Sequence, residues 1–97
     1  TLERAIQRIT TEPANLFGIT QRGRIAEGLA ADFAIFDLTT VGSDKTGEMR
    51  YDLPGGGRRL VVPSRGIEYT VVNGDILYAH GKDSGSRAGT VLRSGEA

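Results

Sequence analysis

Residues 66–82 read GIEYTVVNGDILYAHGK, and this stretch decides the fold. Two apolar-rich runs, at 67–72 and 76–78, flank the pair Asn73-Gly74. Asn and Gly accept positive φ at both central positions of a type I′ turn, the two-residue turn that joins antiparallel strands. The stretch therefore predicts a β-hairpin that ends at Gly81-Lys82.

Two short helices are predicted before residue 18. Four apolar residues recur at the i, i+3, i+4, i+7 spacing of one helix face; they are Leu2, Ala5, Ile6 and Ile9. Thr10 or Thr11 is suited to cap a second helix, with Pro13 in its first turn and Gly18 as a left-handed stop. After residue 18 the apolar period becomes two, which indicates a change from helices to strands.

The other apolar runs predict a few short strands. Residues 33–36 (FAIF), between Asp32 and Asp37, are typical of a buried strand. Residues 38–66 place many Gly and Pro among few apolar positions, so we expect a long irregular excursion in which only 60–62 form a short strand. Downstream we expect a flexible connection at 83–89, a last strand at 90–92 and a frayed tail after Arg93.

These elements predict an α+β, mostly β fold, with two short N-terminal helices followed by an incomplete small β-sandwich or barrel. We expect a helical segment at 1–18 and a β-rich domain at 19–97. Leu, Ile, Val and Phe supply 24 of 97 residues, enough for a folded chain with a modest core. The helical periodicity begins at once after Thr1, so we expect the chain to be cut from a longer one.

Charge and cysteine content exclude several classes of protein. Lys and Arg (12) balance Asp and Glu (12), so no overall field favours nucleic acid or an acidic membrane surface. The chain has no Cys, which excludes a disulfide framework and thiolate metal ligands. No stretch resembles a signal peptide or a membrane span, and we expect a cytoplasmic protein.

Candidate site residues are few, and each has a structural interpretation. His80 is the only His, whereas a catalytic zinc site needs about three protein ligands, so we read it as the residue at the end of a hairpin strand. A four-residue strand holds Asp32 and Asp37 roughly 16 Å apart, too far to share a proton, and we expect each to bond turn backbone. The sequence therefore predicts no catalytic, cofactor-binding or metal-ligating residue.

The glycine run 55–57 with Arg58 and Arg59 invites comparison with a phosphate-binding loop. No Lys-Ser/Thr follows it, and no clear strand and helix flank it, as that mechanism requires. A surface loop is the better interpretation. Its two Arg side chains are candidates to dock on a missing part of the protein or on a neighbouring subunit.

Four segments together resemble the end of amidohydrolase-superfamily enzymes, nearest to the N-acyl-D-amino-acid deacylases (D-aminoacylases). In order, they are LERAIQRITTEPANLFGI (2–19), GRIAEGLAADFAIFDLTTV (23–41), GIEYTVVNGDILYAHGK (66–82) and AGTVLR (88–93). DLPGGGRRL (52–60) resembles an insertion of large members of that branch. The resemblance implies that the helix pair closes a TIM-like barrel and that the strands join an N-terminal segment in a small β-sandwich.

The same resemblance implies a divalent metal, usually zinc, that polarises the scissile amide and its water, with an aspartate moving the proton. Those ligands lie upstream in the family, and none matches a position here. We therefore expect a non-catalytic C-terminal part of an enzyme that hydrolyses N-acyl-D-amino acids to a carboxylate and a D-amino acid. Its expected partners are the missing barrel and N-terminal strands, or a second copy through self-association.

Two alternatives remain open at this point. One is a self-sufficient small β module that binds a partner through an uncovered sheet edge. The other is the same accessory domain taken from a cyclic amidase, such as a dihydropyrimidinase relative.

Overall fold

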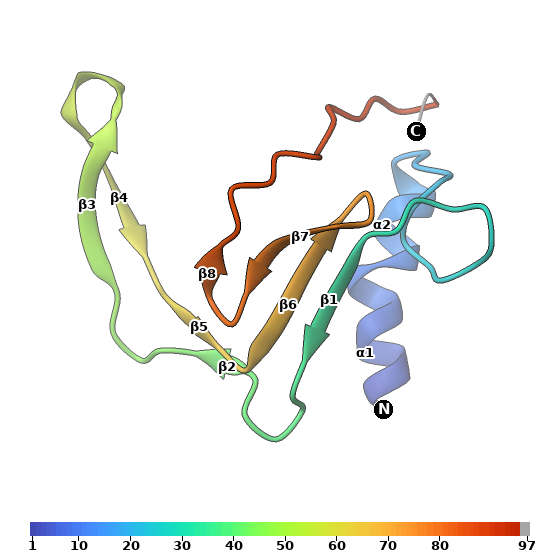
Figure 1. Cartoon of the computed structure of the whole chain (residues 1–97), viewed down its shortest axis with the longest axis horizontal. Coiled ribbons are helices and arrows are strands. Elements are labelled where there is room, and N and C mark those ends of the chain that lie inside the picture. The colour runs from blue at the N-terminus through green and yellow to red at the C-terminus, as the bar shows by residue number, and fades with distance from the viewer. Residues whose placement is uncertain (96–97) are drawn as a thin grey trace.

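The computed structural model describes residues 1–95 and has three parts: a helix pair, a four-stranded sheet and a projecting two-stranded arm (Figure 1). The predicted α+β, mostly β class is confirmed. The elements are α1 (Leu2–Ile9), α2 (Thr11–Leu16), β1 (Phe33–Phe36), β2 (Gly42–Ser43), β3 (Glu48–Leu53), the 3₁₀ turn η1 (Pro54–Gly56), β4 (Gly57–Val61), β5 (Ser64–Arg65), β6 (Ile67–Val72), β7 (Asp75–Ala79) and β8 (Lys82–Asp83).

The helix pair follows the predicted pattern, with one difference in its capping. Thr1 Oγ1 accepts a hydrogen bond from Arg4 N–H at 3.2 Å and so caps α1. Thr10 is the N-cap residue of α2, but its hydroxyl donates back to Ile6 O at 2.7 Å instead of capping the helix. Gly18 has φ +68 and is the left-handed residue expected after α2.

The sheet has the strand order β1-β6-β7-β8, and all its pairs are antiparallel. The predicted hairpin is β6–β7, and its turn residues Asn73 and Gly74 have φ +48 and +82. Both positive values agree with the predicted turn chemistry. The strand predicted at residues 33–36 is β1, which pairs with β6, but the expectation that it is buried is wrong, because Phe33, Ala34 and Ile35 are exposed.

Residues 42–65 form a β-hairpin on a short two-stranded base, and we call this unit the arm. β3 pairs with β4, and β2 pairs with β5 where the arm leaves the sheet. The expected irregular excursion is therefore wrong, as is a single strand at 60–62. Apolar Met49 and Tyr51 alternate with charged Arg50 and Asp52, and this period-two signal was obscured by the surrounding Gly and Pro residues.

The segment after β8 runs back toward the helix pair without forming a further strand (Figure 1). The strand expected at 90–92 is wrong, because Val91 is exposed and these residues pair with no strand in the described chain. Gly89 lies beside Val72, and Gly95 N–H donates to Gly18 O at 3.2 Å. The last two residues of the tail expected to fray, 96 and 97, lie outside the described range.

The chain buries little of its apolar surface. Ala14, at 7% exposure, is the one buried hydrophobic residue among residues 1–95. The accessible area is 7532 Å², whereas a folded monomer of 10.4 kDa exposes roughly 5,400 Å². Its radius of gyration is 15.5 Å, against about 12.5 Å for a compact domain of this length. In the described residues, no helix has the length and apolar character needed to cross a membrane.

Candidate functional site

The best-connected polar group joins the start of β1 to the turn of the central hairpin. Asp32 accepts hydrogen bonds from Arg22 Nε at 2.5 Å and from Asn73 N–H at 2.8 Å. Arg22 Nη2 also donates to Asn73 Oδ1 at 2.7 Å, and Asn73 Nδ2 donates to Ala88 O at 2.7 Å. We call Arg22, Asp32 and Asn73 the turn cluster. It ties together three segments that are distant in sequence.

The environment of Asp32 favours its charged form. Partial burial raises the pKa of this carboxyl, but the hydrogen bonds from Asn73 N–H and Arg22, together with the Arg22 charge, outweigh burial and lower the pKa below its usual value. A carboxylate held this way accepts hydrogen bonds and is a poor proton donor. Asp32 was expected to bond the backbone of the turn before its own strand, whereas its carboxylate accepts from the backbone of the β6–β7 turn.

Asp37 has a separate role at the other end of β1. Its Oδ1 accepts from Thr39 Oγ1 at 2.7 Å and from Thr39 N–H at 2.9 Å, and these bonds lower its pKa. This is the turn-bonding role predicted for it. Its backbone N–H donates to Gly66 O at 2.8 Å, next to the base of the arm. Asp32 and Asp37 thus organise opposite ends of one strand.

His80 follows the last residue of β7, at the strand end where it was predicted, and has φ +50. Its Nδ1 lies 2.8 Å from Glu68 Oε2, and its ring meets the Tyr69 ring edge-on with centroids 5.0 Å apart. A metal would need further donors beside these two residues. Among residues 1–95, no three His, Cys, Asp or Glu side chains are grouped to hold an ion.

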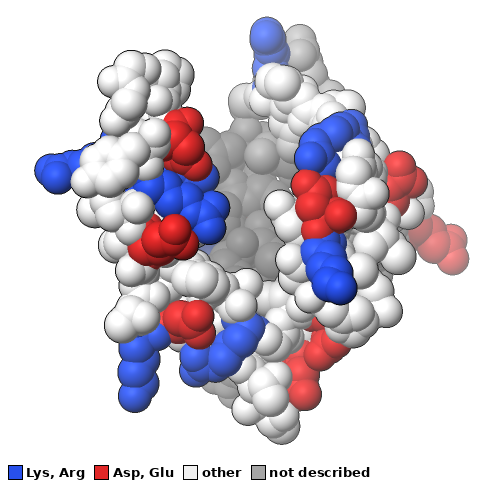
Figure 2. Space-filling view, turned by 60° about the vertical axis from the view of Figure 1, so that its left-hand side comes forward, with Lys and Arg blue, Asp and Glu red and all other residues white. Residues whose placement is uncertain are grey.

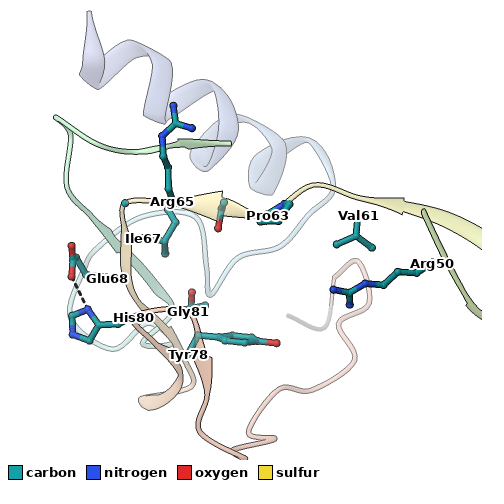
Figure 3. A pocket seen from close by; sticks show the side chains of 12 residues that line it. Arg50, Val61, Pro63, Arg65, Ile67, Glu68, Tyr78, His80 and Gly81 are labelled. Carbon is teal, nitrogen blue, oxygen red and sulfur yellow. Dashed lines mark ion pairs between the residues drawn. The ribbon is translucent and has the colours of Figure 1, made fainter. Parts of the chain in front are cut away.

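A cleft of about 710 Å³ separates the arm from the sheet. In Figure 3, Arg50 and Val61 line it from the arm, and Glu68, Tyr78 and His80 line it from the sheet. Arg50 lies 3.5 Å from the Glu48 carboxylate, and His80 Nδ1 lies 2.8 Å from the Glu68 carboxylate.

The glycine run forms the tip of the arm and no phosphate cradle. Residues 54–56 are a 3₁₀ turn, and a strand, not a helix, begins at Gly57. Arg59 makes a two-point contact with Asp52, through Nε and Nη2 at 2.7 Å each. This contact lowers the pKa of Asp52 and raises that of Arg59. Arg59 is thus engaged within the arm, while Arg58 is exposed.

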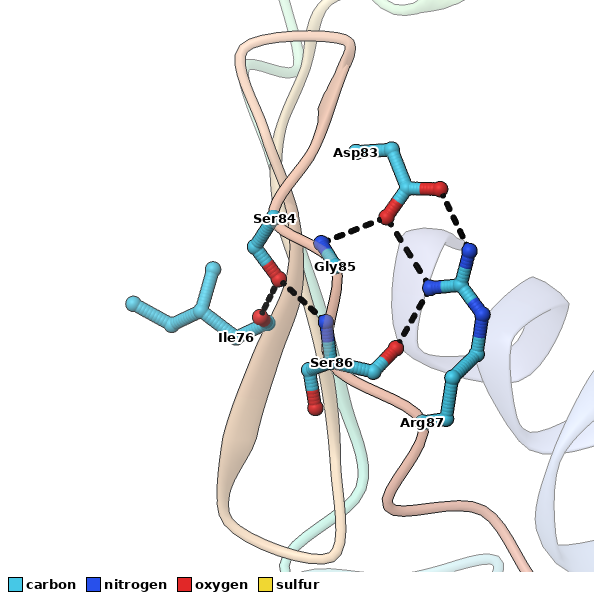
Figure 4. A network of polar contacts seen from close by, with 6 residues as sticks. All are labelled: Ile76, Asp83, Ser84, Gly85, Ser86 and Arg87. Atoms are coloured by element: carbon cyan, nitrogen blue, oxygen red, sulfur yellow. Dashed lines mark hydrogen bonds and ion pairs between the residues drawn. The ribbon is translucent and has the colours of Figure 1, made fainter.

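Sequence reasoning missed the polar turn that follows β8 (Figure 4). Arg87 holds Asp83 through Nη1 at 3.0 Å and Nη2 at 2.8 Å, and Gly85 N–H donates to Asp83 at 2.8 Å. These bonds lower the pKa of Asp83 to about 2. Asp83 followed by Ser84-Gly85 was the available signal, because an Asp side chain often bonds the backbone N–H two residues on. The turn expected to be a flexible connection is held by these contacts.

On the face shown in Figure 2, positive and negative side chains lie beside one another. The hydrogen bonds described above indicate structural roles for Asp32, Asp37 and Asp83 at turns, and for Asp52 and Arg59 within the arm.

Comparison with known proteins places the chain in a family. The model for the amidohydrolase family matches residues 1–78, which is most of the chain. The chain belongs to the amidohydrolase family. The resemblance to this superfamily, near the D-aminoacylases, is thereby confirmed.

Three curated relatives illustrate the match. The chain is 38% identical to an N-acyl-D-glutamate deacylase of Alcaligenes xylosoxydans xylosoxydans over 96% of this chain and 17% of that protein. It is 31% identical to an N-acyl-D-aspartate deacylase of the same organism, over 99% of this chain and 17% of that protein. It is 36% identical to a dihydroorotase of Methanothermobacter thermautotrophicus, over 64% of this chain and 13% of that protein. No solved structure matches.

This amidohydrolase chain spans about a sixth of the length of the deacylases it matches. The family generally implies a divalent metal in the whole enzyme, and the donors in this chain do not fit one. His80 faces a single carboxylate, that of Glu68, and no third donor joins them in the part of the chain that the structure describes.

Proposed function

We propose that this chain is the non-catalytic C-terminal part of a metal-dependent amidohydrolase, and that it completes the fold of the enzyme. Residues 1–18 would pack against a catalytic barrel, and residues 19–97 would form the accessory β domain. The metal, for which zinc is our candidate, would be held by residues of the rest of the protein. We place the enzyme in the cytoplasm.

One observation carries this proposal, namely the open surface of the chain. The accessible area of 7532 Å² exceeds that of a folded monomer of this mass by roughly 2,100 Å². An excess of this size corresponds to one side of a large, permanent interface. Apolar residues on both helices and on the sheet contribute to it, among them Ile9, Leu16, Phe17 and Ile35. A self-sufficient β module would bury such residues in its own core, so this alternative is the weaker one.

For the substrate we propose N-acyl-D-amino acids with an acidic side chain. The support is that two of the relatives are named as deacylases of N-acyl-D-glutamate and N-acyl-D-aspartate. A cyclic amide is the second candidate, because the dihydroorotase shares 36% identity with this chain. The residues that distinguish these substrates would lie in the catalytic barrel.

The test compares the full-length protein with the 97-residue chain, each supplied with zinc. The full-length protein should release D-glutamate or D-aspartate from the N-acyl compounds, and the short chain should release none. His80→Ala in the full-length protein should leave the rate within about twofold, because His80 pairs with Glu68 and meets the Tyr69 ring at the surface. Zinc-dependent turnover by the short chain that His80→Ala abolishes would overturn the proposal.

A further inference from the structure

The turn residues Asn73-Gly74 form a chemically reactive pair. An Asn side chain loses its amide when the next backbone nitrogen attacks the carboxamide carbon, and Asn counts among the thermolabile residues. Gly has no Cβ to shield that nitrogen or to restrict its approach. The other Asn of the chain, Asn15, is followed by the bulky Leu16. Asn73 is therefore the Asn whose sequence context favours this reaction.

The reaction is a cyclisation followed by hydrolysis. Gly74 N gives up its proton and bonds to Asn73 Cγ, while the bond from Cγ to Nδ2 breaks and this nitrogen leaves with that proton as ammonia. Water then opens the cyclic imide at either carbonyl, which yields aspartate or isoaspartate at position 73. Water is the one co-reactant, and Gly74 is exposed to it.

The fold engages both reacting groups in hydrogen bonds. Gly74 N–H, the attacking group, donates to Ala31 O at 2.9 Å. Asn73 Oδ1 accepts from Arg22 Nη2 at 2.7 Å, and Nδ2 donates to Ala88 O at 2.7 Å. These partners fix the orientation of the amide, because a guanidinium only donates and a carbonyl only accepts. The bonds to Ala31 and Ala88 are both lost in the reaction, so they stabilise the unreacted turn.

We propose that Asn73 is a deamidation site that the turn cluster keeps unreacted while the hairpin turn is closed. Asp32 belongs to this protection, because it accepts from Asn73 N–H at 2.8 Å and so holds the backbone of the same residue. Reaction proceeds through transient opening of the turn, and its rate follows the population of the open form. The inference concerns residues of this chain alone and does not depend on the proposed function.

The product of deamidation does not fit the turn cluster. A carboxylate at position 73 has no N–H to donate to Ala88 O. It would also lie near the Asp32 carboxylate, which already accepts from the backbone of the same residue. Isoaspartate adds a carbon to the main chain, so the two-residue turn loses its geometry. Deamidation should therefore loosen the hairpin turn and release the segment after β8.

The test follows the mass of the tryptic peptide 66–82 while the full-length protein is incubated in mildly alkaline buffer. This peptide contains Asn73 and no other Asn or Gln, so its mass gain reports on Asn73 alone. In the native protein, deamidation should be at least about 100-fold slower than in the same protein unfolded in guanidinium chloride, because the turn must open first.

Two variants assign the protection to the turn cluster. Asp32→Asn removes the charge that Arg22 contacts and should raise the native rate at least about tenfold. Asp52→Asn is the matched control, because it also removes a carboxylate held by an Arg, but in the arm. It should leave the rate within about twofold. Both substitutions lie outside the peptide 66–82.

The wild type alone decides whether the site is reactive and protected. Equal rates in the native and unfolded protein would contradict the protection, and a peptide that stays unmodified in the unfolded protein would contradict the reactivity. The variants decide which contacts protect Asn73. A native rate that Asp32→Asn leaves unchanged would remove the turn cluster from the proposal, and so would an equal rise with Asp52→Asn.

Discussion

At the scale of single residues, the side-chain hydrogen bonds of the turn cluster join segments that are distant in sequence. Asp32 accepts from both Arg22 and the backbone of Asn73, so one carboxylate links the loop after the helices to the hairpin turn. Asn73 in turn donates to Ala88 and holds the segment that follows β8. Removal of Asp32, for example, leaves Arg22 Nε and the Asn73 backbone N–H without this acceptor in a half-buried position.

Asp32→Asn should weaken the hairpin turn locally. The amide keeps one acceptor oxygen but loses the charge that Arg22 contacts, and breaking a hydrogen bond to a charged group costs about 1.5–3 kcal/mol. Hydrogen exchange of residues 70–78 in the full-length protein should show the opening free energy falling by about that amount. Asp75→Asn is the control, because Asp75 contacts only Ser86 Oγ, at 3.5 Å, among the side chains described, and the opening free energy should stay within about 0.5 kcal/mol.

The same carboxylate should make the turn sensitive to acid. The pKa of Asp32 is lowered in the fold from a value of 3.8, so its contribution to stability is complete above that value. The contribution is lost as the pH falls below 3.8 and through the lowered pKa of the folded state. Opening of the turn in the wild type should therefore increase in this acid window, and Asp32→Asn should remove that part of the pH dependence.

At the scale of elements, the base of the arm depends on one backbone position. Gly66 has φ +76, and a Cβ built there would lie 2.5 Å from Val41 N. The close approach belongs to the turn that Asp37 organises, since Asp37 N–H donates to Gly66 O. A side chain at Gly66 would have to push Val41, which leads into the arm, away from the start of β6.

Gly66→Ala should destabilise the base of the arm by more than the cost of placing Ala at a positive φ. A left-handed Ala costs about 1–2 kcal/mol, and the clash with Val41 adds to it. Gly28→Ala is the matched control, because Gly28 has φ +82 and nothing within 4 Å of the new Cβ. Hydrogen exchange at residues 38–44 and 64–68 should show a larger loss of protection for Gly66→Ala than Gly28→Ala causes around residue 28. If the two variants lost equal local protection from exchange, Val41 would be able to move away from the new Cβ at little energetic cost.

Elements that local chemistry specifies were predictable from the sequence, and those that depend on distant contacts were not. The helix pair and the β6–β7 hairpin follow from a helical stripe, Gly18 and Asn73-Gly74, which act over a few residues. The arm was missed because both its faces meet water, so its apolar residues looked sparse. The turn cluster joins Arg22 to Asn73 across 51 positions, and no local pattern in the sequence indicates such a pairing.

At the scale of the whole molecule, the chain has secondary structure in place but almost no closed core. The helices pack on each other, yet Leu2, Ile9 and Leu16 remain exposed. An eight-residue helix such as α1 is well short of the roughly 12–15 residues that an isolated helix needs for marginal stability in water. The proposed catalytic body would supply the further packing surface that such a short helix needs.

Hydrogen exchange of the helix pair measures that dependence directly. In the full-length protein, the amides of α1 should exchange at least about 100-fold more slowly than in the 97-residue chain, because packing on the catalytic body adds several kcal/mol to their opening free energy. The amides of β6 provide the internal control: β6 has strands on both sides in either context, so its protection should change much less. Equal exchange of α1 in the two proteins would mean that the helix pair is stable without the rest of the enzyme, and the role proposed for residues 1–18 would fail.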